Sequence, residues 1–209
     1  MTRKPVSERT IRRLSHYSRC LRLAKSRGES VMTSNRLAAA CTISSAAVRK
    51  DLSSFGEFGR KGSGYDVDGL LASIEDILGV ADPPGVVIVG AGNMGRALIA
   101  SGLSGSSGYR VRAVFDSDPA MIGREIGGLR VEPVDALSRI LRELGEVIAV
   151  LAVGRGGGQA ALDRVAAAGC RAVLSFNLEP MKVPEGVCLR FVEVSTELDI
   201  LTHALRSPR

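Results

Sequence analysis

The stretch Val86–Gly95, VVIVGAGNMG, decides the fold of this chain. Its apolar, mostly β-branched residues are typical of a buried strand and lead directly into a G-x-G-x-x-G pattern. The first glycine of this pattern permits a tight turn into a helix, the second lets backbone amides approach a pyrophosphate, and the third lets the helix lie close to the strand. The helix dipole then favours phosphate at its N-terminal end. The stretch therefore predicts a dinucleotide site that includes Gly90, Ala91, Gly92, Asn93, Met94 and Gly95.

A second predicted strand, Val111–Phe115, ends at Asp116. An acidic residue at this point of a dinucleotide-binding fold bonds the hydroxyls of the adenosine ribose, and its charge repels a 2′-phosphate. Asp116 therefore favours NAD(H) over NADP(H). The alternative is a glycine turn that serves only packing, followed by an ordinary aspartate at a strand end.

Beyond residue 85, predicted strands and helices alternate, which is typical of an α/β, Rossmann-like fold with a doubly wound, mainly parallel sheet. We expect strands at 86–90, 111–115, 147–153, 172–176 and 187–194, and helices at 93–103, 133–144, 159–168 and 195–206. Ligands of such sheets lie at the carboxyl ends of the strands. Val153, Gly154 and Phe176 fall at these ends and complete the predicted nucleotide site.

Positive charge is concentrated at the other end of the chain. Residues 1–62 contain 14 Lys and Arg against 4 Asp and Glu, a net charge of +10, whereas residues 63–209 have a net charge of −4. Lysine and arginine that bind DNA release condensed counterions, which supplies much of the affinity. The distribution indicates a polyanion-binding module, although on charge alone a solvated basic face that keeps the protein soluble explains it equally well.

The basic segment also has the pattern of a helix-turn-helix. A basic amphipathic helix is predicted over 5–25, and the residues near its apolar face are Ile11, Leu14, Ser18, Leu21 and Leu23. Two short helices follow, from residue 33 or 34 to 40 and from 45 to 53. The second short helix is the predicted recognition helix, with Ala46, Val48 and Leu52 facing mainly inward. The residues expected to face the major groove are Ser44, Ser45, Ala47, Arg49 and Lys50.

A glycine-punctuated stretch, Phe55–Tyr65, follows and has Arg60 and Lys61 at its tip. As a β-hairpin it is the wing of a winged helix, with both cations in reach of phosphates or the minor groove. The alternative is a flexible linker, but its three aromatic residues are suited to packing. After a short helix over 68–78, the breaker Asp82-Pro83-Pro84-Gly85 predicts a domain boundary.

The composition argues against a membrane protein, a secreted protein and a histidine-based enzyme or metal site. The chain has no long uncharged apolar run and its N-terminus lacks the apolar stretch of a secretory signal, so we expect a cytoplasmic protein with no membrane partner. With only His16 and His203, neither a metal site nor a histidine-based triad is expected. The cysteines form no C-x-x-C pair and are expected to be reduced thiols in or near the core: Cys20, Cys41, Cys170 and Cys188.

Two motifs joined at this distance, Ser44–Gly64 (SSAAVRKDLSSFGEFGRKGSG) and Val86–Gly95, resemble the Rex family of redox-sensing transcriptional repressors. Phe115-Asp116 and Val192–Leu205 support the resemblance, which covers nearly the whole chain. It implies a homodimer that binds inverted-repeat operator DNA through N-terminal winged helices and exchanges its C-terminal helices. It also implies NADH and NAD⁺ as regulatory ligands, with NADH binding releasing the DNA.

From the boundary and the resemblance we expect a winged-helix DNA-binding domain at 1–80, a Rossmann dinucleotide-binding domain at 85–194 and a C-terminal dimerisation helix at 195–209. From the residues alone, that last helix could equally pack within its own subunit, because Leu198, Leu201 and Leu205 recur at helical spacing.

The chain departs from the family pattern near the expected nicotinamide and dimer contacts. A glutamine of the recognition helix is replaced by Ala47, which leaves operator choice open, and the loop Arg155–Gly158 is richer in glycine. The other departures are Ser101 in place of a tyrosine, Asn177 and Leu178 in place of Ala-Pro, and Glu193 in place of an aspartate. The adenosine half matches the family, which implies dinucleotide binding.

The leading hypothesis is a DNA-binding repressor that senses NADH and performs no chemistry. An NAD-dependent oxidoreductase needs a proton donor or acceptor near the nicotinamide, and the candidates, His16, His203 and Lys182, are few. A third possibility is a winged-helix regulator whose Rossmann-like domain binds another adenine nucleotide or a CoA-like ligand, or serves only dimerisation.

Overall fold

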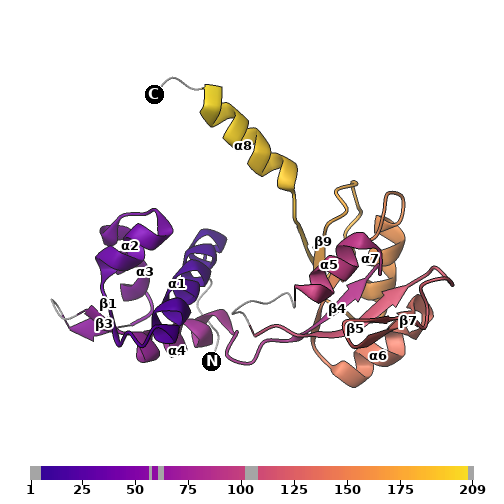
Figure 1. The fold of residues 1–209 in the computed structure, drawn as a ribbon, viewed down its shortest axis with the longest axis horizontal. Helices are drawn as coiled ribbons and strands as arrows, with labels where there is room; N and C mark the ends of the chain where they lie inside the picture. The colour runs from indigo at the N-terminus through magenta and orange to yellow at the C-terminus, as the bar shows by residue number, and fades with distance from the viewer. Residues whose placement is uncertain (1–5, 57, 61–63, 102–107, 207–209) are drawn as a thin grey trace. The chain divides into compact units, whose positions relative to one another are not determined.

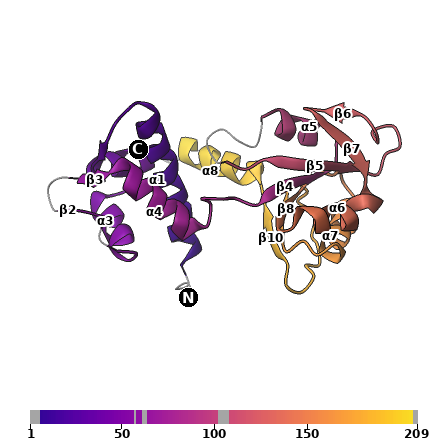
Figure 2. The same cartoon turned by 90° about the horizontal axis from the view of Figure 1, so that it is seen from below.

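The computed structural model describes residues 6–56, 58–60, 64–101 and 108–206, with Gly59 and Arg60 described by their backbone alone. The chain folds into two compact units that divide between Pro83 and Pro84, with Gly108 grouped with the first. Figures 1 and 2 show the first unit in indigo to purple and the second in magenta to yellow. Each unit is described by itself below.

The first unit is a winged helix, built from four helices and a small antiparallel sheet. The strands lie in the order β1-β3-β2, so that β3 pairs with both neighbours. Its elements are α1 (Glu8–Ser26), β1 (Val31–Met32), α2 (Ser34–Cys41), α3 (Ser45–Ser53), β2 (Gly59–Arg60), β3 (Gly64–Asp66) and α4 (Val67–Leu78).

Helix α1 is packed through a stripe that contains Leu14, Ser18 and Leu21 of the predicted face. Its buried side chains are Leu14, Tyr17, Ser18, Leu21 and Ala24, which follow the i, i+3, i+4, i+7 spacing of a single helix face. The expectation for Ile11 and Leu23 was wrong, because they lie off this stripe and are 43% and 52% exposed. These side chains pack on buried residues of α2, α3 and α4, which form one core.

The second unit is a doubly wound α/β fold. Its seven-stranded sheet has the order β10-β9-β8-β4-β5-β7-β6, parallel throughout except for the β6–β7 pair. The strands are β4 (Gly85–Val89), β5 (Val111–Asp116), β6 (Glu125–Ile126), β7 (Leu129–Pro133), β8 (Val147–Leu151), β9 (Ala172–Ser175) and β10 (Cys188–Phe191). The helices are α5 (Asn93–Ala100), the 3₁₀ turn η1 (Val134–Ala136), α6 (Leu137–Leu144), α7 (Gly158–Ala167) and α8 (Val194–Arg206).

The sequence analysis missed the β6–β7 hairpin. Its loop is Gly127-Gly128, and both glycines have positive φ, 58° and 78°, as a two-residue hairpin turn requires. The predicted helix over 133–144 starts late for the same reason, because β7 extends to Pro133 and the 3₁₀ turn precedes α6.

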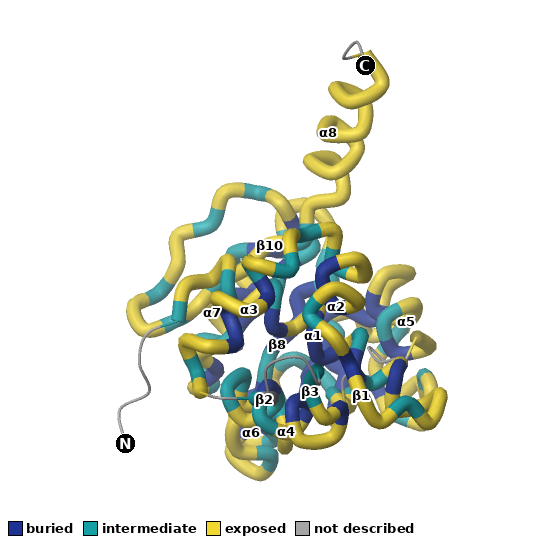
Figure 3. The backbone as a smooth tube through the Cα atoms, turned by 90° about the vertical axis from the view of Figure 1, so that its left-hand side faces the viewer, coloured by how far each residue is buried: buried dark blue, intermediate teal, exposed yellow. Residues whose placement is uncertain are grey.

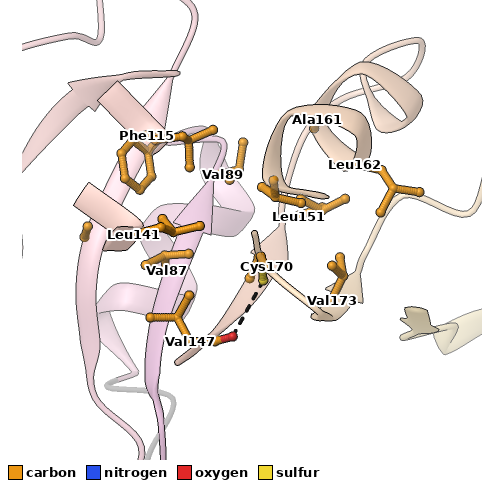
Figure 4. Close-up of a cluster of buried hydrophobic side chains, with 14 residues drawn as sticks. Val87, Val89, Phe115, Leu141, Val147, Leu151, Ala161, Leu162, Cys170 and Val173 are labelled. Atoms are coloured by element: carbon orange, nitrogen blue, oxygen red, sulfur yellow. Dashed lines mark hydrogen bonds between the residues drawn. The ribbon is translucent and has the colours of Figure 1, made fainter. Parts of the chain in front are cut away.

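The core of this unit lies on both faces of the sheet. In β4, Val87 and Val89 join the cluster under α6 and α7, whereas Val86 and Ile88 join the cluster on the other face with Ile99 of α5. Figure 4 shows the first cluster, in which the thiol of Cys170 donates to the carbonyl of Val147. Burial on both faces is why these strands are continuous apolar runs rather than alternating ones.

Helix α8 differs from every other α-helix of the described chain, because none of its residues is buried. Figure 3 shows it exposed along its whole length. Its apolar side chains Val194, Leu198, Leu201 and Leu205 are 58–88% exposed. In the part of the chain that the structure describes, no helix combines the length and apolar character needed to cross a membrane.

Candidate nucleotide and DNA-binding sites

The glycine turn joins β4 to α5 with a geometry that requires two of its glycines. Gly90 has φ of 106°, and a Cβ there would lie 2.5 Å from the carbonyl oxygen of Ala152. A Cβ on Gly95 would lie 1.9 Å from the carbonyl oxygen of Gly90. Around Gly92, by contrast, no heavy atom lies within 4 Å of the Cβ position, so the backbone there is open to a ligand.

The N-terminus of α5 is suited to an anion. Gly92 is its N-cap residue and supplies no side-chain capping bond, and the first turn contains no acidic residue. The free N–H groups and the helix dipole therefore favour a phosphate at this end.

Asp116 lies at the carboxyl end of β5, beside the glycine turn. Its Oδ2 accepts a hydrogen bond of 2.7 Å from the N–H of Ala91, and its Oδ1 accepts one of 2.9 Å from the N–H of Asp118. A carboxylate has about four lone-pair sites, so both oxygens keep capacity for ribose hydroxyls. Asp116 thus holds the turn in place and remains able to bind sugar.

A cavity of about 380 Å³ lies at the carboxyl ends of β4, β5 and β8, next to these groups. Of the predicted site, Gly90, Gly92, Asp116, Val153 and Gly154 line it. Ala91, Asn93, Met94 and Gly95 belong to the turn and the first turn of α5, and Phe176 follows β9 at the same edge of the sheet; none of these five lines the cavity. A larger cavity, about 620 Å³, lies at the amino ends of β8 and β9 and is remote from the glycine turn.

The cavity also has lining residues that the sequence analysis missed. Arg155 and Arg164 bring two cations to its wall, and Arg164 lies 3.2 Å from the carboxylate of Asp135. The other missed residues are small or apolar: Ser117, Val134, Ala152, Gly157, Ala160 and Ala161.

A polar network ties the loop after β8 to the loop after β9. The buried Asn177 donates from Nδ2 to the carbonyl of Gly154 at 2.9 Å, and its Oδ1 accepts from the N–H of Glu179. Glu179 in turn accepts from the N–H of Gly156 through both carboxylate oxygens, at 3.0 and 2.8 Å. The departure from the family pattern at Asn177 thus fixes the glycine-rich loop that forms one wall of the nucleotide cavity.

The helix-turn-helix is formed by α2, the turn at Thr42-Ile43-Ser44 and α3. Ser44 caps α3, because its Oγ accepts from the N–H of Ala47 at 3.2 Å. Arg49 and Lys50 are exposed on α3, and Arg49 donates to Oγ of Ser34 at 3.3 Å. Ser45 and Ala47 are half-buried. The expectation that Ala46 faces inward was wrong, since it is exposed.

Helix α3 is anchored to α1 by an ion pair that the sequence analysis did not identify. Arg13 donates to both oxygens of the buried Asp51, each at 2.6 Å, and the hydroxyl of Tyr17 donates to Asp51 at 2.8 Å. Burial alone raises the pKa of Asp51, but the hydrogen bonds from Arg13 and Tyr17 outweigh it and hold the pKa below its usual value. Burial is the largest cause that raises the pKa of Tyr17, and the hydrogen bond to Asp51 raises it further.

The predicted wing is present as the β2–β3 pair. Arg60 lies in β2, opposite Gly64 of β3. Its side chain and the whole of Lys61 lie outside the described residues, so the predicted DNA contacts of these two cations stay predictions.

Two family models match the chain. Residues 5–53 match the model described as "Putative DNA-binding protein N-terminus", and residues 82–178 match "CoA binding domain". The first match contains the helix-turn-helix and the second contains the glycine turn and Asp116.

Comparison with solved structures gives the same fold over nearly the whole chain. A structure of RSP, a Rex-family repressor, in complex with NAD⁺ and operator DNA has a TM-score of 0.85 and 31% identity, covering 97% of this chain and 93% of that one. A structure of RSP in complex with NADH has a TM-score of 0.84 and 28% identity, covering 97% and 95%.

The chain is also similar to proteins named redox-sensing transcriptional repressor Rex. The protein of Streptomyces coelicolor is 41% identical over 94% of this chain and 76% of its own length. The protein of Roseiflexus sp. is 39% identical over 93% and 89%, and Rex 1 of Thermotoga maritima is 38% identical over 97% and 95%. With this identity, coverage and fold, the chain belongs to the Rex family of redox-sensing transcriptional repressors.

Proposed function

We propose that this protein is a transcriptional repressor that binds operator DNA as a homodimer and releases it when NADH binds. One observation carries the proposal: a single chain joins a winged helix with exposed cations on its recognition helix to a glycine turn and Asp116 that together border a nucleotide-sized cavity. RSP has been solved with NADH and with NAD⁺ plus operator DNA, which supports the proposal that this chain also binds both the dinucleotide and DNA.

We assign the three regions accordingly: 1–80 binds DNA, 85–194 binds the dinucleotide and 195–209 forms the dimer. Gly90–Gly95 would cradle the pyrophosphate and Asp116 the adenosine ribose, with Val153, Gly154 and Phe176 completing the nucleotide site. Ser44, Ser45, Ala47, Arg49 and Lys50 would face the major groove, while Arg60 and Lys61 anchor the wing. The protein would act in the cytoplasm, where operator DNA lies.

NADH can change DNA affinity only through linkage. If NADH binds one dimer conformation more tightly than the other, it shifts the population by that difference, and DNA binding weakens NADH binding by the same factor. A tenfold change in operator affinity therefore requires about 1.4 kcal/mol of differential NADH binding.

The proposal includes no catalysis. The described residues that line the nucleotide cavity include Asp116, two arginines and one serine, but no histidine, lysine or tyrosine to exchange a proton with a substrate. The relatives named above are repressors, which favours the same conclusion.

The exposed apolar face of α8 supports the homodimer. Isolated apolar side chains are normal on a surface, but a row of them along one helix indicates a face that another chain covers. Analytical sedimentation of the wild type and of Leu201→Glu tests the homodimer, and the variant should be monomeric. Thr202→Glu, on the same exposed helix, is the control and should remain dimeric.

The central experiment is a titration of NADH, and separately of NAD⁺, into the protein bound to a labelled inverted-repeat operator at fixed salt, because salt alone changes DNA affinity. We expect release at much lower NADH than NAD⁺ concentration. Equal DNA binding at all concentrations of both would refute the redox switch.

One alternative ligand has a specific observation in its favour, because residues 82–178 match a model named for CoA binding. Calorimetry that compares the affinities for CoA, ATP and NADH distinguishes a redox sensor from a regulator that binds a CoA-like ligand. The proposed redox sensor requires NADH to bind most tightly. If CoA binds tightly and NADH does not, the winged-helix regulator of a CoA-like ligand replaces the redox sensor.

A further inference from the structure

Two cysteines that are 21 residues apart in sequence meet in the winged-helix unit. The Sγ atoms of Cys20, on α1, and Cys41, the last residue of α2, lie 3.9 Å apart in hydrogen-bonding geometry. Both side chains are half-buried beside the core that joins these helices. The pair therefore lies at the packing contact between the first helix and the helix-turn-helix.

A surface cavity gives access to one of the two thiols. A cavity of about 430 Å³ is lined by Cys20 and not by Cys41, and it has Arg27 and Arg36 in its wall. Peroxide would therefore reach Cys20 first.

We propose that Cys20 and Cys41 are a dithiol that hydrogen peroxide converts into a reversible disulfide. The site is separate from the proposed NADH switch, since all its residues belong to the winged-helix unit.

The chemistry takes two steps. The sulfur of Cys20 attacks one oxygen of hydrogen peroxide, the O–O bond breaks and hydroxide leaves with the thiol proton as water, giving a sulfenic acid. The sulfur of Cys41 then attacks that of Cys20, the S–S bond forms, the S–O bond breaks and a second water leaves with the proton of Cys41. Two thiols lose two electrons in total, and one peroxide becomes two waters.

The environment of Cys41 fits the second role. Burial, and then the neighbouring Cys20, raises the pKa of Cys41 to about 12, so it keeps its proton at neutral pH. As a thiol it can donate to the sulfur of Cys20 across the 3.9 Å between them. It resolves the sulfenic acid slowly, but it is already in place to do so.

Closing the bond would move the helix-turn-helix. An S–S bond is about 2 Å long, so the sulfurs must approach by a further ~2 Å. Cys41 is followed at once by Thr42, which has a left-handed φ of 54°, and then by Ser44, the cap of α3. The recognition helix thus begins four residues after Cys41, and we expect operator affinity to fall about tenfold on oxidation.

Mass spectrometry tests the disulfide directly, because trypsin puts each cysteine on a separate peptide. The full-length Cys188→Ser protein, which lacks the exposed cysteine, is treated with a slight excess of hydrogen peroxide. We expect a loss of about 2 Da, the mass of two hydrogens, in a linked pair of peptides, 20–22 with 37–49, which dithiothreitol reverses. The proposal would be overturned by any one of three results. These are an unchanged mass, the addition of oxygen at Cys20 without a link, and a link to the peptide that contains Cys170.

Single cysteine variants test the link and its effect on DNA binding. Cys20→Ala and Cys41→Ala should prevent the link, and Cys170→Ala, which alters a buried thiol of the other unit, should leave it intact. Oxidised Cys188→Ser protein should bind the operator about tenfold more weakly, and the Cys20→Ala form should not respond to peroxide. If the link forms while operator affinity stays constant, the effect on the recognition helix is refuted. Because the mass measurement requires no DNA or NADH, its outcome does not depend on the proposed function.

Discussion

Replacing Asp51 by Asn should destabilise the winged-helix unit while leaving the nucleotide-binding unit unchanged. The substitution preserves the size of the side chain but removes its charge, so that Arg13 loses a bidentate ionic partner and Tyr17 a charged acceptor. Among the described residues, the side chain of Asp51 is hydrogen-bonded to Arg13 and Tyr17, both of which lie on α1. The effect therefore measures how strongly α3 is held to α1.

The magnitude follows from the burial of the three groups. Breaking a buried ion pair costs about 3–5 kcal/mol. The Arg13 side chain is 24% exposed and can be partly rehydrated, and the asparagine oxygen can still accept one hydrogen bond, so we expect about 2–3 kcal/mol. Tyr17→Phe, which removes one hydrogen bond and leaves the pair intact, should cost about 1 kcal/mol.

Native-state hydrogen exchange of the full-length protein, read by mass spectrometry, resolves the two units. Peptides from α1 and α3 should lose protection, and peptides from β4, β5 and β8 should not. Asp68→Asn is the matched control, because it removes the exposed ion pair with Lys25 on the neighbouring helix and should leave protection unchanged. If Asp51→Asn costs no more than Tyr17→Phe, the ion pair does not anchor the recognition helix.

The same carboxylate predicts a pH dependence. The folded pKa of Asp51 is below that of the unfolded chain, about 3.9, so its contribution is complete well above pH 4 and is lost as the pH falls through the folded value. The wild type should therefore lose stability relative to Asp51→Asn on acidification below about pH 4, and parallel curves for the two proteins would contradict this.

Three further substitutions test the sites. Gly95→Ala should abolish NADH binding in calorimetry, because the new Cβ meets the Gly90 carbonyl at 1.9 Å, and retained binding would contradict the turn geometry. Asp116→Asn should weaken NADH binding about tenfold, as expected for lost charge-assisted bonds to ribose, and reduce discrimination against NADPH; unchanged affinity would remove Asp116 from the site. Arg49→Ala should weaken operator binding by about 1–3 kcal/mol and relax specificity at one base pair if Arg49 reads a guanine, whereas equal weakening on all sequences in a competition assay would make it a phosphate contact.

The glycine turn and the position of Asp116 could be predicted because their requirements are local. The tight turn at Gly90 and the close approach at Gly95 each demand glycine within a few residues, and Asp116 ends a strand of recognisable pattern. The hydrogen bonds that join the loops after β8 and β9 were missed, because they link residues 23 apart in sequence, Asn177 to Gly154 and Glu179 to Gly156. No periodicity in the sequence encodes such a pair.

In the winged helix, too, local features could be predicted from the sequence, whereas contacts between distant residues could not. Helix boundaries in α2 and α3 followed from capping residues, but the rotation of each helix about its axis is set by tertiary packing. Ala46 was assigned to the wrong face, and the ion pair of Asp51 was not identified because its partners lie 34 and 38 residues away. The cysteines were expected near the core, yet Cys188 is exposed, and Cys20 meets Cys41 only because α1 crosses α2.

Helix α8 has a consequence for how the protein responds to its own concentration. Its 13 residues bury nothing within the described chain, and a helix of that length is marginal in water without tertiary support. If a second chain supplies that support, dilution should convert this segment from helix to coil as the pair separates. The amount of repressor in a cell would then set the fraction competent for cooperative binding at two half-sites, before any nucleotide is bound.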